Sequence, residues 1–362
     1  MKKYILPEYP CRQDMWDILA EEKRPIVVYG MGNGADKLFS RFEKYGIMVA
    51  DVFASDGFVR GHSFRGYRVK SFSEIKEAYS DFVIVLSFAS GRTEVIEMLC
   101  DMDKDYDMYV PDMPVADESD YFDREHYNSN YDEIVSSYNL LCDEESKSIY
   151  AATVNYKLTG KLSYLLEIYT NKADMYSIVC KKSIKTMIDA GAYNGDTARE
   201  AVEYFPEVSQ IYAIEPDKKT FKRLRKYAES APVKIHTINA AVYSENTSGT
   251  LFAAGNRNST AVATASYENT EEMVDFITID SLGADADYIK YDVEGAEYEA
   301  LCGSLQTIER SRPVLLVSLY HRSRDIHFLP SFINEHISGY KYYLRRLRTI
   351  PAWDLNLILI PT

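Results

Sequence analysis

Three charged residues alternate along a short and otherwise apolar stretch, Asp287-Tyr-Ile-Lys-Tyr-Asp-Val-Glu294. Lys290, Asp292 and Glu294 stand two residues apart, so their side chains share one face if the stretch is a β-strand. A central parallel strand is normally apolar, and buried charges are costly unless they are paired or serve a ligand. The spacing predicts a functional role for Asp292 and Glu294, whereas Lys290 fits a structural ion pair equally well.

A second candidate site is a glycine-rich segment that follows the short run Thr186-Met-Ile-Asp189. Glycines at a strand-to-helix turn let the backbone approach a ligand closely, and the free N–H groups of the next helix suit a carboxylate. The carboxylate of Asp189 suits an ammonium group. The segment therefore predicts a ligand-binding turn, with a purely structural turn as the alternative; its candidate residues are Asp189, Gly191, Ala192, Asn194, Gly195 and Thr197.

Two further candidates follow the next two expected strands. Glu215, in Ala213-Ile-Glu-Pro-Asp217, stands where an acid accepts hydrogen bonds from ribose hydroxyls in dinucleotide folds. The alternative is an acid that stabilises a helix N-terminus, which suits Asp217 better than Glu215. Asn239 and Ala240, at the end of the third strand, fit contacts to an adenine ring, and Pro216 completes this set.

The order of expected elements predicts an α/β fold with two Rossmann-like lobes joined by a helical connector. Residues 24–112 alternate strands and helices, which implies a small parallel sheet covered by helices. Residues 113–184 begin with a stretch rich in acidic residues and continue with helical periodicity. Residues 185–362 give seven strands, the last two as an antiparallel edge pair. We therefore expect domains at 1–112, 113–184 and 185–362.

Five motifs in the third block occur in order with familiar spacing, and together they resemble the FkbM family of methyltransferases. They are Asp189-Ala-Gly-Ala-Tyr-Asn-Gly-Asp-Thr, Ala213-Ile-Glu-Pro-Asp, Ile279-Asp-Ser, Asp287-Tyr-Ile-Lys-Tyr-Asp-Val-Glu-Gly-Ala-Glu and Val317-Ser-Leu-Tyr-His. The resemblance covers residues 176–362. It implies a class I Rossmann-like fold with S-adenosylmethionine as methyl donor, and O-methyl transfer to sugars or other hydroxylated metabolites. Asp189, Gly191 and Glu215 would bind the donor, together with Asp292. Tyr193 departs from the glycine that many class I enzymes carry.

A hydroxyl acceptor needs a base near the point of transfer, since it is a weak nucleophile. His321, at the end of the fifth expected strand, is the leading candidate because its ordinary pKa suits proton transfer at neutral pH. A hydrogen-bonded structural histidine is the alternative, and Glu294 and Glu297 are rival bases. We assign catalysis to His321, Glu294 and Asp292. Asp280, Asp292 and Glu294 could hold a divalent metal, but no spacing requires one and none is assigned.

The first lobe carries a similar turn without equivalent support. Gly30-Met-Gly-Asn-Gly-Ala35 after a strand, with Asp56 after the next, is a loose dinucleotide fingerprint. Phe64-Arg-Gly-Tyr-Arg-Val69 resembles the N-terminal domains of sugar-modifying enzymes that contact nucleotide sugars. Recognition of a nucleotide-linked or glycan acceptor and a scaffold or dimerisation role are equally favoured, and nicotinamide binding is disfavoured.

Charge and composition limit the remaining classes of function. A formal net charge of −14 disfavours binding to the phosphates of nucleic acids. The sequence shows no signal peptide and no apolar run long enough to span a bilayer. Its five cysteines form no disulfide or zinc pattern. We expect a cytoplasmic enzyme that acts on a small-molecule or glycan acceptor, and a homodimer is compatible with this expectation. The alternative function is a donor-binding scaffold or regulatory protein without transfer activity.

Overall fold

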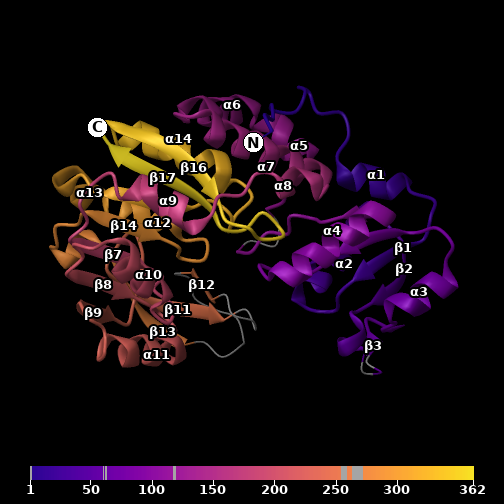
Figure 1. Cartoon of the computed structure of the whole chain (residues 1–362), viewed down its shortest axis with the longest axis horizontal. Coiled ribbons are helices and arrows are strands. Elements are labelled where there is room, and N and C mark those ends of the chain that lie inside the picture. The colour runs from indigo at the N-terminus through magenta and orange to yellow at the C-terminus, as the bar shows by residue number, and fades with distance from the viewer. Residues whose placement is uncertain (1, 60, 62, 117–119, 254–258, 263–271) are drawn as a thin grey trace.

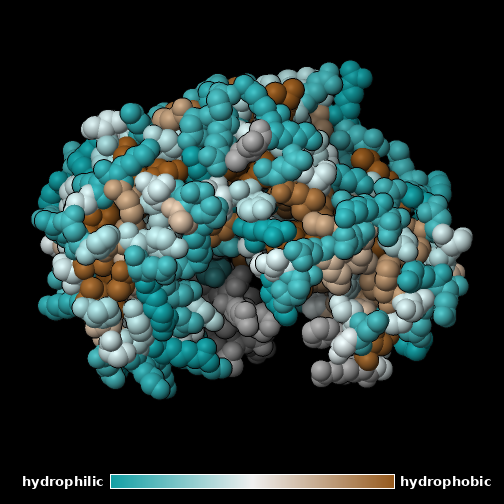
Figure 2. Space-filling view, in the orientation of Figure 1, coloured by the Kyte–Doolittle hydropathy of each residue, from teal (hydrophilic) through white to brown (hydrophobic). Residues whose placement is uncertain are grey.

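The computed structural model describes residues 2–59, 61, 63–116, 120–253, 259–262 and 272–362. The chain forms an N-terminal lobe, a helical connector and a larger C-terminal part, and the connector lies across both lobes (Figure 1). In the orientation of Figure 2 the molecule is hollowed between the two lobes, beneath the connector. Among the described residues, the longest helices fall short of what a bilayer crossing requires.

The C-terminal part is built on a seven-stranded sheet of order β16-β17-β15-β14-β7-β8-β9. The five strands from β15 to β9 are parallel, and β17 pairs antiparallel with β15 and with β16. This order and edge pair confirm the expected class I methyltransferase sheet. The strands are β7 Thr186–Ala190, β8 Gln210–Ile214, β9 Lys234–Ile238, β14 Tyr288–Tyr291, β15 Val314–Ser318, β16 Tyr340–Arg346 and β17 Leu355–Pro361.

Helices follow most of these strands, as parallel crossover connections require. The connection between β14 and β15 holds two short helices, which are divided at Gly303. The helices are α10 Asp196–Tyr204, α11 Lys218–Ala228, α12 Glu297–Cys302, α13 Leu305–Ser311 and α14 Asp325–His336.

A second sheet of order β10-β13-β11-β12 lies between β9 and β14 in sequence, and it was not expected. Strand β9 ends at Ile238, and a separate short strand follows after two intervening residues. The stretch 247–253, Thr-Ser-Gly-Thr-Leu-Phe-Ala, lacks the apolar alternation that marks a strand. The strands are β10 Ala241–Val242, β11 Thr247–Ala253, β12 Ser259–Val262 and β13 Glu272–Ile277.

The N-terminal lobe contains a four-stranded parallel sheet of order β2-β1-β5-β6, which confirms the Rossmann-like prediction. Its helix α3 begins at a capping box: the Ser71 hydroxyl accepts from Glu74 N, and the Glu74 carboxylate accepts from Ser71 N. The elements are α1 Met15–Glu21, β1 Ile26–Tyr29, α2 Asn33–Tyr45, β2 Val49–Phe53, η1 Asp56–Phe58, β3 Ser63–Phe64, β4 Tyr67–Arg68, α3 Phe72–Ala78, β5 Val83–Leu86, α4 Thr93–Asp105 and β6 Asp107–Tyr109.

The connector is helical from residue 124 and packs mainly on the C-terminal part. Leu344 N donates to the Ser146 hydroxyl at 2.8 Å, and the Ser137 hydroxyl donates to His327 O at 2.7 Å. One apolar core runs through both lobes and the connector. The connector therefore shares a continuous core with its neighbours. Its helices are α5 Arg124–Ser129, α6 Tyr131–Leu140, α7 Glu144–Thr159, α8 Ser163–Leu166 and α9 Lys172–Val179.

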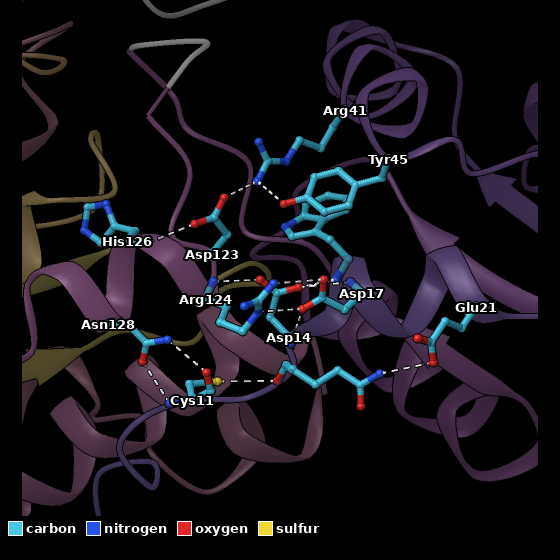
Figure 3. A network of polar contacts seen from close by, with 12 residues as sticks. Cys11, Asp14, Asp17, Glu21, Arg41, Tyr45, Asp123, Arg124, His126 and Asn128 are labelled. Carbon is cyan, nitrogen blue, oxygen red and sulfur yellow. Dashed lines mark hydrogen bonds and ion pairs between the residues drawn. The ribbon is translucent and has the colours of Figure 1, made fainter.

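A buried arginine joins the N-terminal lobe to the connector (Figure 3). Arg41 of α2 is 4% exposed, and its guanidinium contacts the Asp123 carboxylate at 2.5 Å. The guanidinium also lies 4.1 Å from the Tyr121 ring centroid. Arg124 then pairs with Asp17 of α1 at 2.8 Å. Because the charge of Arg41 is both desolvated and paired, loss of one partner would leave a costly buried charge.

Candidate active site

The parallel register brings the carboxyl ends of β7, β8 and β14 to one edge of the sheet. Lys290 is the register partner of Asp189, and Ala190 is the partner of Ile214. In doubly wound sheets a ligand binds outside the strand ends, where the strand order reverses. Here the order reverses between β7 and β14, so the predicted glycine turn and the predicted charged strand meet at that point.

The glycine turn after β7 is held tightly against the turn after β14. Gly191 has φ +83°, and a Cβ there would lie 1.8 Å from Asp292 O, which excludes any larger residue. Gly195 also has positive φ and caps α10, where no side chain caps the helix. Ala192 and Thr197 are buried beside it, and Tyr193 is exposed. The Asn194 oxygens accept from Arg199. These contacts give the turn one fixed backbone path.

Glu215 ties the end of β8 to this glycine turn. One carboxylate oxygen accepts from Tyr193 N and the other from Asp217 N, each at 2.9 Å. Burial raises the pKa of Glu215 to about 7, against the lowering effect of these bonds. Asp217 itself caps α11 through Thr220 N, as its alternative role predicted.

Asn239 supports the same corner from the end of β9. Its side-chain amide donates to Glu215 O at 2.8 Å and to Pro216 O at 3.0 Å. The amide hydrogens of Asn239 are therefore used within the protein, and only its side-chain oxygen remains for a ligand. Ala240 follows it, buried.

Lys290 lies between two carboxylates. Its Nζ is 3.1 Å from Asp292 Oδ2 and 3.6 Å from Asp189 Oδ1. Asp189 has no exposed surface, and neither of its carboxylate oxygens has a hydrogen-bond partner. Burial raises the pKa of Asp189 to about 7, although Lys290 lowers it. The ion pair expected as the structural role of Lys290 is thus present, at the floor of the predicted donor site.

A second group of side chains gathers where β14 and β15 end. His321 is fully buried, and its Nδ1 donates to Glu297 Oε1 at 2.9 Å. Its Nε2 lies 3.5 Å from Asp292 Oδ1 and 3.4 Å from Glu294 Oε2. We call Asp292, Glu294, Glu297 and His321 the strand-end cluster. Glu294 has φ +54°, a left-handed conformation unusual for glutamate.

The carboxylates of the strand-end cluster favour the protonated, positively charged form of His321. Burial lowers the pKa of His321, but Glu297, Glu294 and Asp292 together raise it to about 10. Burial raises the pKa of Glu294 to about 7. Asp292 keeps a pKa of about 2 because Lys290, His321 and the Tyr320 hydroxyl outweigh its burial. An imidazole held as a cation has no free lone pair, which disfavours His321 as the base and leaves Glu294 as the accessible carboxylate.

The structure adds one residue to this cluster and removes one candidate from it. The Tyr320 hydroxyl donates to Asp292 Oδ1 at 3.0 Å; Tyr320 stands in the motif Val317-Ser-Leu-Tyr-His, but the sequence assigned it no role. Asp280, considered as a metal ligand, instead accepts from Gln306 N and Thr307 N at the start of α13. Its role is to cap that helix, so it does not join Asp292 and Glu294.

The segment that enters the connector forms part of the wall of this site. Val115 N and Ala116 N both donate to His321 O, at 3.1 and 3.0 Å. A Cβ on Gly295 would lie 2.4 Å from the Ala116 Cβ. Lys37 of α2 in turn donates to Pro114 O at 3.0 Å. The N-terminal lobe is therefore connected to the strand-end cluster through this segment.

The glycine turn of the N-terminal lobe has a packing explanation. A Cβ on Gly30 would lie 2.5 Å from Ser87 Oγ, and one on Gly34 would lie 2.1 Å from Ser87 O. Both glycines are required by the close approach of this turn to the end of β5. Asp56 lies in η1 rather than at the end of β2. Nucleotide binding there stays a prediction.

The fold is that of a class I methyltransferase. Residues 189–342 match the family model described as the methyltransferase FkbM domain. The chain thus carries an FkbM-family methyltransferase domain, as the motifs predicted. No curated protein sequence matches the chain.

Solved structures extend the similarity of fold beyond this domain. The chain resembles a methyltransferase FkbM from Methylobacillus flagellatus KT, with a TM-score of 0.70, 18% identity, and coverage of 98% of this chain and 94% of that chain. The N-terminal lobe and connector therefore belong to an architecture shared with that protein. A precorrin-6y C5,15-methyltransferase from Geobacter metallireducens GS-15 covers 53% of this chain and 90% of its own, with 13% identity and a TM-score of 0.31. The match to a protein from Streptococcus mutans, solved in complex with SAH, covers 53% of this chain and 99% of that chain, with 11% identity and a TM-score of 0.34.

Proposed function

We propose that the protein is an S-adenosylmethionine-dependent O-methyltransferase that acts on a hydroxyl of a sugar, glycan or related small metabolite. The observation that carries the proposal is the meeting of three features at one sheet edge. These are the fixed turn at Gly191, the Glu215 carboxylate one strand away, and the strand-end cluster on the other side. A donor and an acceptor bound at this edge would lie next to each other.

The residues at β7 and β8 fit the methyl donor. Asp189 is a buried acid whose carboxylate oxygens lack hydrogen bonds. Burial of such a group is costly, and the positive charge of the donor's ammonium group would offset this cost. Glu215 uses one lone pair of each oxygen on the backbone, so each oxygen keeps capacity for a ribose hydroxyl. The uncapped start of α10 suits a carboxylate. Asn239 and Pro216 position Glu215 and border the place expected for adenine.

The donor supplies a methyl group on a sulfonium: the bond from acceptor oxygen to methyl carbon forms while the carbon–sulfur bond breaks and its electron pair stays on sulfur. The protein has to align the acceptor and take the hydroxyl proton. We assign the proton to Glu294, because its side chain is 33% exposed and can meet an acceptor, whereas His321 is fully buried. Asp292 contacts the acceptor beside it, and His321 positions both carboxylates.

A hydroxyl-rich acceptor suits the partly exposed carboxylates of Glu294 and Asp292, which both accept hydrogen bonds. The acceptor would enter from the hollow between the lobes, where residues 114–116 border the site. This placement favours an acceptor large enough to contact the N-terminal lobe, such as a nucleotide-linked sugar or a glycan.

The decisive experiment incubates the protein with methyl-labelled S-adenosylmethionine and a panel of glycans, nucleotide sugars and hydroxylated metabolites. Calorimetry with S-adenosylhomocysteine runs in parallel. Donor binding together with a labelled methyl ether supports the proposal. Binding with no product across the panel and a cell extract favours a donor-binding scaffold, and absence of binding rejects the donor assignment.

A further inference from the structure

The imidazole of His321 is oriented in a way that the proposed proton transfer does not use. Its Nδ1 is committed to Glu297, whose Oε1 also accepts from Val293 N at 2.9 Å. Its Nε2 is buried without a hydrogen-bond partner. That nitrogen points between two carboxylates that come from the turn after β14. With no ion bound this nitrogen carries a proton, which a metal ion would displace on binding. An imidazole oriented by a carboxylate behind it is the usual arrangement of a metal-ligating histidine.

The distances around Nε2 are long for hydrogen bonds and short enough for a shared ion. Nε2 lies 3.5 Å from Asp292 Oδ1 and 3.4 Å from Glu294 Oε2. Two ligand atoms that each lie about 2.1 Å from a metal ion at a tetrahedral angle are about 3.4 Å apart. Ligand atoms of Asp292, Glu297 and His321 also lie within 4.8 Å of one another. His321 Nε2 is therefore close enough to each of the two carboxylates to share an ion with it.

Carboxyl groups outnumber basic side chains around the cluster. The carboxyl groups of Asp189, Asp292, Glu294, Glu297 and Asp325 interact electrostatically with one another or with His321. Lys290 offsets part of this charge, and the Arg322 guanidinium is turned to Gly295 O at 2.7 Å. Asp292 and Glu294 are 29% and 33% exposed, so the group opens toward solvent on one side only.

We infer that the strand-end cluster binds a first-row divalent metal ion through His321 Nε2 and the carboxylates of Asp292 and Glu294, with Glu297 as the positioning residue that orients the imidazole. One nitrogen with two carboxylate oxygens suits Mn²⁺, Fe²⁺, Co²⁺ or Zn²⁺ better than Mg²⁺ or Ca²⁺, which prefer oxygen alone. Three protein ligands leave positions open for an acceptor hydroxyl, whose proton a bound ion would make more acidic. Glu294 keeps its second oxygen for that proton.

This inference rests on the proposed function for the role of the ion, but binding is tested without turnover. Mn²⁺ is titrated into the metal-free full-length protein and followed by electron paramagnetic resonance and calorimetry. We expect one saturable site per chain. Glu297→Gln should weaken binding about 10- to 100-fold, and Glu294→Gln and His321→Ala should weaken it further. His236→Ala, on the edge strand β9, should bind as the wild type does.

His321→Ala empties a buried position, so each variant is first checked by circular dichroism and thermal unfolding. Glu294→Gln is partly exposed and keeps the test decisive if His321→Ala does not fold. Absence of saturable Mn²⁺ binding, or equal affinity in wild type and folded Glu294→Gln and Glu297→Gln variants, overturns the metal site. If the protein binds S-adenosylhomocysteine but not Mn²⁺, only the metal site is rejected. If it binds Mn²⁺ but not S-adenosylhomocysteine, only the donor site is rejected.

Discussion

Nδ1 of His321 donates its hydrogen to Oε1 of Glu297 across 2.9 Å, and this bond joins the end of β15 to the start of α12. The bond fixes the imidazole orientation and directs Nε2 toward Asp292 and Glu294. Both residues are almost completely buried, so the geometry is held by packing as well as by charge. Glu297, considered from the sequence only as a rival base, is in this arrangement the support for the other three.

The first prediction concerns Glu294 as the proton acceptor. Glu294→Gln keeps the shape of the side chain but cannot take the hydroxyl proton at neutral pH. We expect the rate of methyl transfer to fall about 10²- to 10⁴-fold. Affinity for S-adenosylhomocysteine should stay within twofold, since Glu294 is assigned to the acceptor and not to the donor. Single-turnover transfer with labelled donor and calorimetry measure the two effects, and an unchanged transfer rate would contradict the assignment.

The second prediction compares two glycines that both have positive φ. Gly191→Ala would place a Cβ 1.8 Å from Asp292 O, whereas at Gly283 nothing lies within 4 Å. Gly283→Ala should cost only the left-handed backbone penalty, about 1–2 kcal/mol. Gly191→Ala should cost clearly more and abolish donor binding, because the two turns must separate. Urea unfolding and S-adenosylhomocysteine calorimetry test this; similar losses in both variants would argue against the close contact.

The third prediction concerns donor affinity at Glu215. Glu215→Gln removes the negative charge and turns an amide toward a backbone N–H. Loss of charge-assisted hydrogen bonds should weaken S-adenosylhomocysteine binding about 10- to 100-fold. In the wild type, binding should strengthen from pH 6 to pH 8, because the pKa of about 7 means that the accepting carboxylate forms over this range. Glu229→Gln, at the exposed end of α11, is the matched control and should change nothing.

The fourth prediction links the same residue to stability. Burial raises the pKa of Glu215 to about 7 from its ordinary 4.5, so the folded protein holds the proton more tightly than the unfolded chain. Its contribution to stability is complete below about pH 4.5 and is lost as the pH rises to about 7, a difference of order 3 kcal/mol. The free energy of unfolding should therefore fall more steeply over this interval in the wild type than in Glu215→Gln. Parallel slopes would show that burial does not shift this carboxyl group.

The fifth prediction concerns the joint between the N-terminal lobe and the connector. Arg41→Met removes a buried guanidinium and leaves Asp123 without its partner. We expect a loss of about 3–5 kcal/mol in the free energy of unfolding, measured with urea. Lys104→Met breaks an exposed pair with Asp101 and should cost less than about 1 kcal/mol. If both variants lose the same small amount, Arg41 is not a structural anchor.

The sequence by itself determined the class of fold and most of the donor corner. Strand-to-helix alternation from residue 185 onward, with an antiparallel pair at the end, was enough to predict the class I sheet, because hydrophobic periodicity reports local structure. The Gly191 turn and Glu215 were identifiable since strand ends in such sheets meet at one edge. Strands β11 and β12 escaped prediction because their largely polar sequences have no hydrophobic period.

Only the tertiary structure decided how the charged residues divide their roles. Lys290 and Glu294 look equivalent in the strand pattern, but one pairs with buried Asp189 and the other, at φ +54°, lies beside His321. His321 met Glu297, and Asp280 instead capped α13, through contacts that depend on how helices pack on the sheet. Likewise Gly30 and Gly34 match a nucleotide fingerprint by spacing, yet their closeness to Ser87 explains them by packing. Spacing along a chain fixes which face a side chain occupies, whereas burial and partners arise from segments far apart in sequence.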